Sequence, residues 1–398
     1  MPLGVPLEFW LFGATLAGVA ALHKHALWIS LAGFVAIFGY KLLAGVWGIT
    51  GLQSHFTHEW VLLANLFLLL LGFAVLANQF ELSNAPEAMP GLLPQNWTGG
   101  LCLLGLIFLL SIILDNIAGA VVGGVVARHA FRDKVSIGFL AAIVAAANAG
   151  GAGSVIGDTT TTMIWIAGVS PLEVAPAFIG AAGAFAIFGV AASIQQHRLS
   201  PIQPHTGAKL ELDWMRLVTV GAMLFSLLCT NVVVSGFLPQ LEHILPMLGL
   251  GLWVSIIATS FVRKPDWTVL NPAAKGAVFL LALVAAASMM PVESLPEPSW
   301  QSVFGIGVIA AVFDNIPLTA LALAQGGYDW GLLAYAVGVG GSTLWFGSSA
   351  GVALTNLFPE GRSAIRWVKE GWHVAVAYAF GFFFMLAVVG WSVSPVHQ

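Results

Sequence analysis

The stretch that decides the fold is Asn148-Ala-Gly-Gly-Ala-Gly-Ser-Val-Ile-Gly-Asp158-Thr-Thr-Thr-Thr162, a polar, glycine-rich sequence inside a long apolar run. Upstream of it, Ser111-Ile-Ile-Leu-Asp115-Asn116-Ile117 places an acid and an amide among apolar residues. The second half repeats both features, with Asp314-Asn315-Ile316-Pro317 and then Gly340-Gly341-Ser342-Thr343. A carboxylate at the middle of a bilayer costs ~3 kcal/mol or more. The Asp-Asn pair occurs twice, and each time a glycine-rich polar stretch follows it. This repetition indicates two structurally related halves around a polar site.

The composition is that of a membrane protein. The chain of 398 residues is 59% hydrophobic and only 8% charged, and its mean hydropathy is +0.92. Its apolar runs approach the roughly 20 residues that span a bilayer as a helix, and they lack the alternation of a membrane β-strand. The net charge of −4 is too small to indicate a nucleic-acid partner. We therefore predict an all-α polytopic protein of the inner (cytoplasmic) membrane, in contact with lipid.

The distribution of Lys and Arg predicts how the Asp-Asn segments enter the membrane. Basic residues of membrane proteins gather in cytoplasmic loops. If segment 301–325 crossed the membrane in one straight span, the acidic loop 291–299 and the basic loop 362–369 would lie on the same side of the membrane. If it instead turns at Asp314-Asn315 and leaves again, one side holds every basic segment from residue 128 onward: 128–134, 198–216, 263–275 and 362–369. We therefore predict re-entrant hairpins, which are tolerated where protein surrounds them.

These hairpins divide the chain into two repeats of inverted topology. The first repeat is predicted over 1–195 and the second over 214–398, with a cytoplasmic linker at 196–213. Each has three spans, a hairpin, an interrupted helix and a final span, which gives about ten full spans. The last three elements are expected at 99–128, 136–169 and 174–194, then at 301–325, 330–357 and 371–393. Matching residues keep similar separations, since 314 − 115 = 199 and 341 − 151 = 190.

Interrupted helices in inverted-repeat transporters place backbone carbonyls and helix ends near the middle of the membrane. We expect Gly150, Gly151 and Gly153 to unwind the first interrupted helix, and Gly338, Gly340 and Gly341 the second. Sodium prefers oxygen ligands, and the predicted cation and proton site therefore consists of Asp115, Asn116, Asn148, Asp158, Thr159, Thr160, Asp314, Asn315, Ser342, Thr343, Ser348 and Ser349. Within it, a sodium ion is assigned to Asp115, Asn116, Asp158 and Thr159.

Asp158 and Asp115 are the predicted exchanging acids. Burial favours the neutral form of a carboxylate and a bound cation favours the charged form, so a proton and sodium compete for the same group. Other interpretations stay open: each Asp can simply cap a helix, and Thr161 and Thr162 can bond back to their own helix. Gly123 and Gly124 are expected at close helix contacts. Lys41, in an apolar run, is expected to extend to the interface.

The stretches Leu114-Asp115-Asn116-Ile117, Asn148 to Trp165, Asp314 to Leu318 and Gly340 to Ala353 resemble the NhaD-type sodium/proton antiporters. That family belongs to a wider ion-transporter superfamily with citrate, dicarboxylate and arsenite carriers. The resemblance implies electrogenic exchange of sodium, often also lithium, for protons, and a homodimer with a scaffold domain and a moving transport domain. It implies no covalent cofactor, and it carries family importance to Asp115, Asn116, Asn148, Asp158, Thr159, Thr160, Asp314 and Asn315.

Two positions depart from the family pattern. Ile117-Ala118-Gly119 follow the first Asp-Asn, where hydroxyl residues are usual, and Gly153 stands where a tryptophan is common. These changes enlarge the expected pocket and keep a second function open, a sodium- or proton-coupled carboxylate carrier of the citrate type. No Arg or Lys lies in the predicted site to neutralise such an anion. An enzyme is not predicted, because the sequence has no nucleophile–base or metal-ligand cluster.

Overall fold

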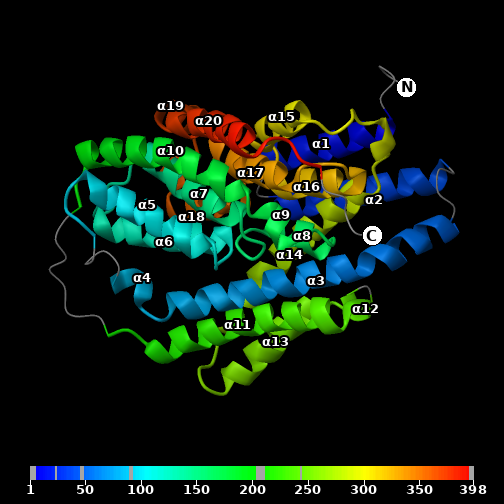
Figure 1. Ribbon diagram of the computed structural model, residues 1–398, viewed down its shortest axis with the longest axis horizontal. Coiled ribbons are helices and arrows are strands. Elements are labelled where there is room, and N and C mark those ends of the chain that lie inside the picture. The colour runs from blue at the N-terminus through cyan, green and yellow to red at the C-terminus, as the bar shows by residue number, and fades with distance from the viewer. Residues whose placement is uncertain are drawn as a thin grey trace. The chain divides into compact units, whose positions relative to one another are not determined.

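The computed structural model describes residues 6–22, 25–44, 49–88, 93–202, 211–242 and 244–393, and all regular structure in these residues is helical (Figure 1). The prediction of an all-α protein is therefore confirmed. Six helical stretches of the described residues are long and apolar enough to cross a membrane, at 26–43, 59–81, 171–199, 214–234, 267–288 and 372–389. Five shorter apolar helices accompany them, at 7–19, 97–111, 137–152, 247–260 and 300–310. The chain is thus a polytopic membrane protein.

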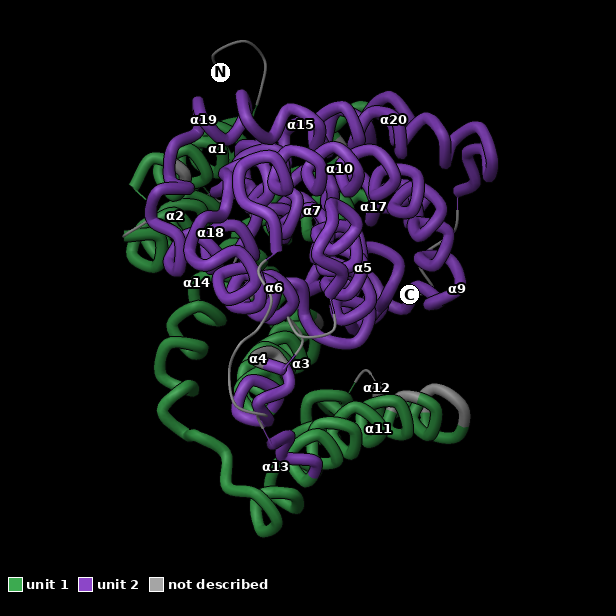
Figure 2. The backbone as a smooth tube through the Cα atoms, turned by 90° about the vertical axis from the view of Figure 1, so that its left-hand side faces the viewer, with its two compact units in different colours: residues 1–79, 215–296, 320–325 green, residues 80–214, 297–319, 326–398 purple. Residues whose placement is uncertain are grey.

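The chain folds into two compact units, coloured separately in Figure 2. Unit 1 contains residues 1–79, 215–296 and 320–325, and unit 2 contains residues 80–214, 297–319 and 326–398. Each unit therefore takes segments from both predicted repeats. The hairpins and interrupted helices lie in unit 2, apart from the end of the second hairpin, and so unit 2 holds all the predicted site residues.

Unit 1 is built from long apolar helices. Its helices are α1 (Leu7–Ala21), α2 (Ala26–Leu43), α3 (Ile49–Glu81), α11 (Trp214–Phe237), α12 (Pro239–Glu242), α13 (Met247–Ser260) and α14 (Leu270–Ser288), with short turns η4 (Trp267–Val269) and η5 (Val292–Ser294). At the end of α3, buried Gln79 donates to the carbonyl of Arg263 at 3.1 Å and accepts from the Arg216 guanidinium. Two of the predicted basic segments thus meet at one end of this unit.

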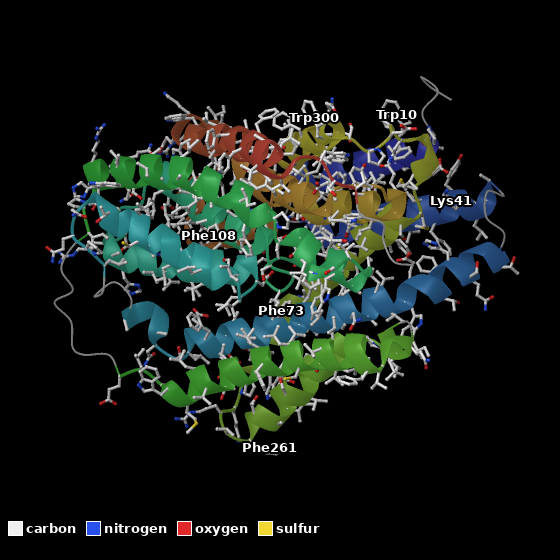
Figure 3. The ribbon with its side chains drawn as sticks, viewed as in Figure 1. Trp10, Lys41, Phe73, Phe108, Phe261 and Trp300 are labelled. Atoms are coloured by element: carbon white, nitrogen blue, oxygen red, sulfur yellow. The ribbon has the colours of Figure 1, made fainter. Side chains whose placement is uncertain are left out.

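Lys41 lies in the last turn of α2 and pairs with an acid in the first turn of α1. Its expected place at the membrane interface stays a prediction. Its side chain, on α2 (labelled in Figure 3), is only 3% exposed, and its Nζ lies 3.1 Å from Oε1 of Glu8 on α1, which is 7% exposed. A charge buried between apolar helices requires a partner of opposite sign. The two helices can pack closely because Gly33 on α2 faces Thr15 on α1.

Lys41→Met is expected to lower the free energy of unfolding by about 1–3 kcal/mol, because Glu8 would be left buried without its cation. Thermal unfolding in detergent measures this loss. Combining it with Glu8→Leu is expected to restore the stability, since an apolar pair of similar size needs no charge compensation. A single variant as stable as the natural protein would contradict the assigned role of the ion pair.

Unit 2 surrounds the apolar helix α7, which contacts α5, α6, α10 and α17. Its helices are α4 (Ala85–Ala88), α5 (Trp97–Ser111), α6 (Asn116–Ala130), α7 (Ile137–Ala152), α8 (Thr159–Ile166), α9 (Pro171–Val174), α10 (Ala177–Leu199), α15 (Trp300–Ala310), the start of α16 (Asn315–Gln325, of which residues 320–325 belong to unit 1), α17 (Trp330–Gly340), α18 (Ser349–Leu357), α19 (Ala364–Glu370) and α20 (Trp372–Val389), with turns η6 (Gly341–Thr343) and η7 (Pro359–Gly361). Every residue of α7 is buried.

Both predicted hairpins and both predicted interruptions correspond to breaks in the helices. The first hairpin breaks before Asp115 and the second before Asp314. α5 and α6 run antiparallel: Gly119 faces Ser111, and Gly123, one turn further, faces Ile107, one turn earlier. The prediction that Gly123 serves close helix contact is confirmed. The interrupted helices break between α7 and α8 and between α17 and α18.

The glycines of the first interruption act differently from the expectation. Gly150 and Gly151 remain inside α7, and helical structure ends only at Gly153. Gly150 is required for close approach, because a Cβ there would lie 2.1 Å from the carbonyl oxygen of Phe108 on α5 (labelled in Figure 3). Gly157 likewise leaves no room for a side chain, since its Cβ would lie 2.0 Å from the carbonyl oxygen of Ser111.

The second interruption repeats these close approaches. Gly338 and Gly340 remain inside α17, and the break begins after them. A Cβ on Gly340 would lie 2.2 Å from the carbonyl oxygen of Gly307 on α15, and one on Gly347 would lie 2.5 Å from that of Ala311. The glycines therefore let each interrupted helix pack against the backbone of its own hairpin.

Three predicted basic segments meet at one end of unit 2. Near the end of α10, the Gln196 side chain donates to the carbonyl of Lys134 at 2.8 Å. Its neighbour Gln195 donates to the carbonyl of Glu370 at 3.3 Å. The segments around 128–134, 198–200 and 362–370 therefore share one end of this unit, as the distribution of charge predicts for loops on one side of a membrane.

Candidate functional site

Asn116 connects the first hairpin to the first interrupted helix. It is the first residue of α6, and it is 4% exposed. Its side-chain nitrogen donates to Oδ2 of Asp158 at 2.8 Å and to Oδ1 of Asn148 at 2.9 Å. An amide nitrogen has two N–H groups, so both donors of Asn116 are used.

Asn148 extends this network into the second half of the chain. It lies on α7 and is fully buried. Its side-chain nitrogen donates to the hydroxyl oxygens of Ser342 at 2.9 Å and Ser348 at 3.1 Å. These two serines flank the second interruption, and both are fully buried. One buried chain of hydrogen bonds therefore joins both interrupted helices.

Asp158 is held as a hydrogen-bond acceptor on both oxygens. It caps α8, and Oδ1 accepts from the backbone N–H of Thr160 at 2.8 Å and from the Thr160 hydroxyl at 2.9 Å. Oδ2 accepts from Asn116. Asp158 is 1% exposed, so the three donors replace the water that the carboxylate loses on burial. Asp158 therefore caps α8 and also belongs to the hydrogen-bond network of the site.

Asp115 has an oxygen that no described residue binds. It caps α6, with Oδ2 accepting from the backbone N–H of Ile117 at 3.3 Å, and it is 8% exposed. Its Oδ1 is buried and has no hydrogen-bond partner among the described residues. The Thr159 hydroxyl lies beside this carboxylate, and Asp158 is near enough to repel it electrostatically. A cation or a proton between the two acids would relieve that repulsion.

The second half contributes one acid, Asp314, followed by the amide Asn315. Asp314 caps α16, with Oδ1 accepting from the backbone N–H of Ile316 at 3.1 Å, and Oδ2 accepts from the Ser349 hydroxyl at 2.8 Å. Asn315 is 2% exposed, and its side-chain nitrogen has no partner among the described residues. Thr343 ends η6, half-buried, and among the described residues it does not join the network of Asn148.

Thr161 and Thr162 bond back to their own helix, as predicted. Their hydroxyls donate to the carbonyl of Asp158 at 2.8 and 2.9 Å. Each hydroxyl has a single hydrogen and shares it with a second carbonyl in the unwound segment, that of Ser154 for Thr161 (2.6 Å) and that of Val155 for Thr162 (2.8 Å). These threonines therefore fix the shape of the first break and leave its cation chemistry to other residues.

Sequence reasoning missed two residues that shape the site. Ser154, in the first break, donates to the carbonyl of Ile112 at the hairpin turn (2.6 Å). Trp367 on α19 donates through its indole nitrogen to the carbonyl of Ser342 at 3.2 Å. The position of Ser154 beside the glycines could have indicated its role. No local sequence signal indicates that of Trp367, which depends on how α19 packs.

The expected enlargement of the pocket at Gly153 is wrong. A Cβ on Gly153 would lie 2.5 Å from atoms of the Phe178 ring, so this ring already fills the space beside the glycine. Phe178 lies on α10, and its ring centroid is 6.4 Å from that of Phe108 on α5. The observation that favoured an organic anion therefore does not hold at this position.

The site thus consists of buried carboxylates, amides and hydroxyls from both halves, arranged around breaks in apolar helices. The chain is 28% identical over 285 residues to sodium/proton antiporter 1 of Arabidopsis thaliana, covering 63% of this chain and 49% of the plant protein. It is 28% identical over 360 residues to Na(+)/H(+) antiporter NhaD of Alkalimonas amylolytica, covering 76% and 72% of the two chains.

The chain is a homologue of NhaD-type sodium/proton antiporters. Na(+)/H(+) antiporter NhaD of Vibrio parahaemolyticus is also similar, with 27% identity over 303 residues, covering 63% of this chain and 71% of that protein. No protein-family model matches the chain. The chain spans about half the length (49%) of sodium/proton antiporter 1 of Arabidopsis thaliana. It spans 67% of sodium/proton antiporter 2 of the same plant and 72% of the Alkalimonas protein. The resemblance to the NhaD-type antiporters is therefore confirmed.

Proposed function

We propose that the chain exchanges sodium ions for protons across the cytoplasmic membrane, and that Asp158 and Asp115 are the acids that exchange them. The observation that carries this proposal is the buried network in which Asn116 links Asp158 to Asn148 and so to the serines of the second break. The relatives are named as sodium/proton antiporters, and an all-oxygen site of this kind agrees with that activity.

The two acids have different surroundings and therefore different proposed roles. Asp158 is oriented by three neutral donors, which fix its position and favour its charged form. Asp115 lies beside it with a buried oxygen that has no partner among the described residues. We assign sodium to Asp115, Asn116, Asp158 and Thr159, with the free oxygen of Asp115 as the point at which a proton or sodium binds. Because either ion neutralises the same pair, each displaces the other.

The same proposal includes two repeats of inverted topology, with the Asp-Asn segments as re-entrant hairpins. Its support is the constant separation of matched features. Asp158 caps α8 and Ser348 caps α18, with 348 − 158 = 190, and the close-approach glycines give 340 − 150 = 190. Their backbone partners give 307 − 108 = 199, the separation of Asp115 and Asp314. The repeats differ in chemistry, because Ser348 stands where the first repeat has Asp158.

Transport by the reconstituted protein tests the function. Vesicles that contain the protein and a pH-sensitive dye receive NaCl, LiCl, KCl or sodium citrate. We expect sodium chloride, and lithium chloride to a similar extent, to drive proton movement, and we expect potassium chloride to drive little. Uptake of labelled citrate without any response to chloride salts would overturn the proposal and indicate a carboxylate carrier. We further propose a homodimer, which the mass of the purified protein in detergent would test.

A further inference from the structure

Trp367 occupies an unusual position for a tryptophan on a connecting segment. It lies on the short helix α19, between the second interrupted helix and α20, in one of the basic segments. Tryptophans near the ends of membrane spans generally rest at the interface. The Trp367 side chain is instead fully buried, and a Cβ on Gly361 would lie only 3.4 Å from its ring. α19 also contacts α7, the helix that carries Asn148.

The indole nitrogen of Trp367 is joined to Asp158 by an unbroken chain of buried hydrogen bonds. The nitrogen donates to the carbonyl of Ser342 at 3.2 Å, and the hydroxyl of the same serine accepts from Asn148. Asn148 accepts in turn from Asn116, which also donates to Asp158. Each amide nitrogen in the chain has both its N–H groups paired. A displaced Ser342 would therefore leave a buried N–H of Asn148 without its acceptor, which is costly.

The two breaks are restrained from different places. Thr161 and Thr162, in the first interrupted helix itself, donate to carbonyls of the first break. In the second break, the Ser342 carbonyl instead accepts from Trp367, which lies outside the interrupted helix. The indole is a donor only, so this contact has one possible direction. The geometry of the second break thus depends on the segment that carries α19.

We propose that Trp367 is a positioning residue for the carboxylate site, acting through Ser342. It holds the second break so that the Ser342 hydroxyl meets Asn148, and it thereby orients Asn116 and Asp158. The proposal rests on the proposed function only for its transport readout. The positioning itself is a property of the folded protein and can be measured without transport.

Trp367→Phe removes the indole N–H and keeps an aromatic ring. Hydrogen–deuterium exchange is expected to become faster in residues 341–348, while the rest of unit 2 is unchanged. The apparent KM for sodium is expected to rise about three- to tenfold, the effect of one buried hydrogen bond, with a smaller change in the maximal rate. Trp253→Phe is the matched control, because the Trp253 indole donates to the carbonyl of Leu68 at 2.9 Å within unit 1. It is expected to leave both quantities unchanged.

A double-mutant cycle with Ser342→Ala separates positioning from general destabilisation. If Trp367 acts through Ser342, the two changes together raise the KM by no more than the larger single change. Independent, multiplying effects would overturn the proposal. So would unaltered exchange in residues 341–348 of Trp367→Phe, and so would an equal response of Trp253→Phe. If the natural protein moved no protons with sodium, the proposed function would fail, whereas the exchange measurement would still decide the role of Trp367.

Discussion

Asp158→Asn is expected to abolish sodium-driven proton movement while leaving the protein folded. Asparagine caps a helix as well as aspartate does, so α8 keeps its first turn. The amide cannot carry a proton in exchange for sodium, and the site loses a negative charge. Sodium binding is expected to weaken about 10- to 100-fold, the loss of one charge-assisted contact. The transport assay in vesicles measures the first effect, and thermal unfolding in detergent checks the fold.

The chain provides a matched control for this change in the exposed Asp266. Oδ1 of Asp266 accepts from the backbone N–H of Thr268 at 3.0 Å and from the Thr268 hydroxyl at 2.7 Å, as Asp158 does from Thr160. These bonds lower the pKa of the Asp266 carboxyl. Asp266→Asn therefore removes a charge from the same cap geometry outside the site, and transport is expected to remain. Normal sodium-driven proton movement by Asp158→Asn would remove Asp158 from the mechanism.

Much of the site could be predicted because its polar residues stand out from the apolar residues next to them in the sequence. A buried acid or amide is costly in a membrane, and so Asp115, Asn116, Asn148 and Asp158 are conspicuous in apolar runs. The structure joins three of them directly, through the side-chain nitrogen of Asn116. The approximate places of the breaks were predictable for a related reason, since clusters of glycine and polar residues mark loops and turns. The helices nevertheless run on through Gly150, Gly151 and Gly340 before they end.

The remaining features depend on tertiary contacts that no local pattern records. Gly150 was expected to unwind α7, yet it continues the helix and makes room for the backbone of α5. Lys41 pairs with Glu8, 33 residues earlier in the chain (41 − 8 = 33), a contact that no local pattern indicates. Trp367 has the sequence position of an interface tryptophan, yet α19 packs against α7 and its tryptophan is fully buried. In each case the sequence shows the residue type and the packing decides its role.

Gly150→Ala is expected to destabilise unit 2 by more than about 3 kcal/mol, because overpacking at rigid atoms is costly. The added methyl group would lie 2.1 Å from the carbonyl oxygen of Phe108, and a backbone atom cannot turn aside as a side chain does. The helices α5 and α7 would have to separate, and the first break would move away from its hairpin. Thermal unfolding in detergent and the yield of folded protein measure the effect.

Gly305→Ala distinguishes this clash from a general effect of glycine replacement. Gly305 also lies inside a helix of unit 2, but nothing lies within 4 Å of a Cβ at that position. Alanine is a better helix former, so this variant is expected to gain about 0.5–1 kcal/mol. Gly340→Ala is expected to behave like Gly150→Ala, because its Cβ would lie 2.2 Å from the carbonyl oxygen of Gly307. Equal losses at the two sites would follow from two repeats packed alike. If Gly340→Ala were stable and Gly150→Ala were not, the two interrupted helices would not pack against their hairpins in the same way.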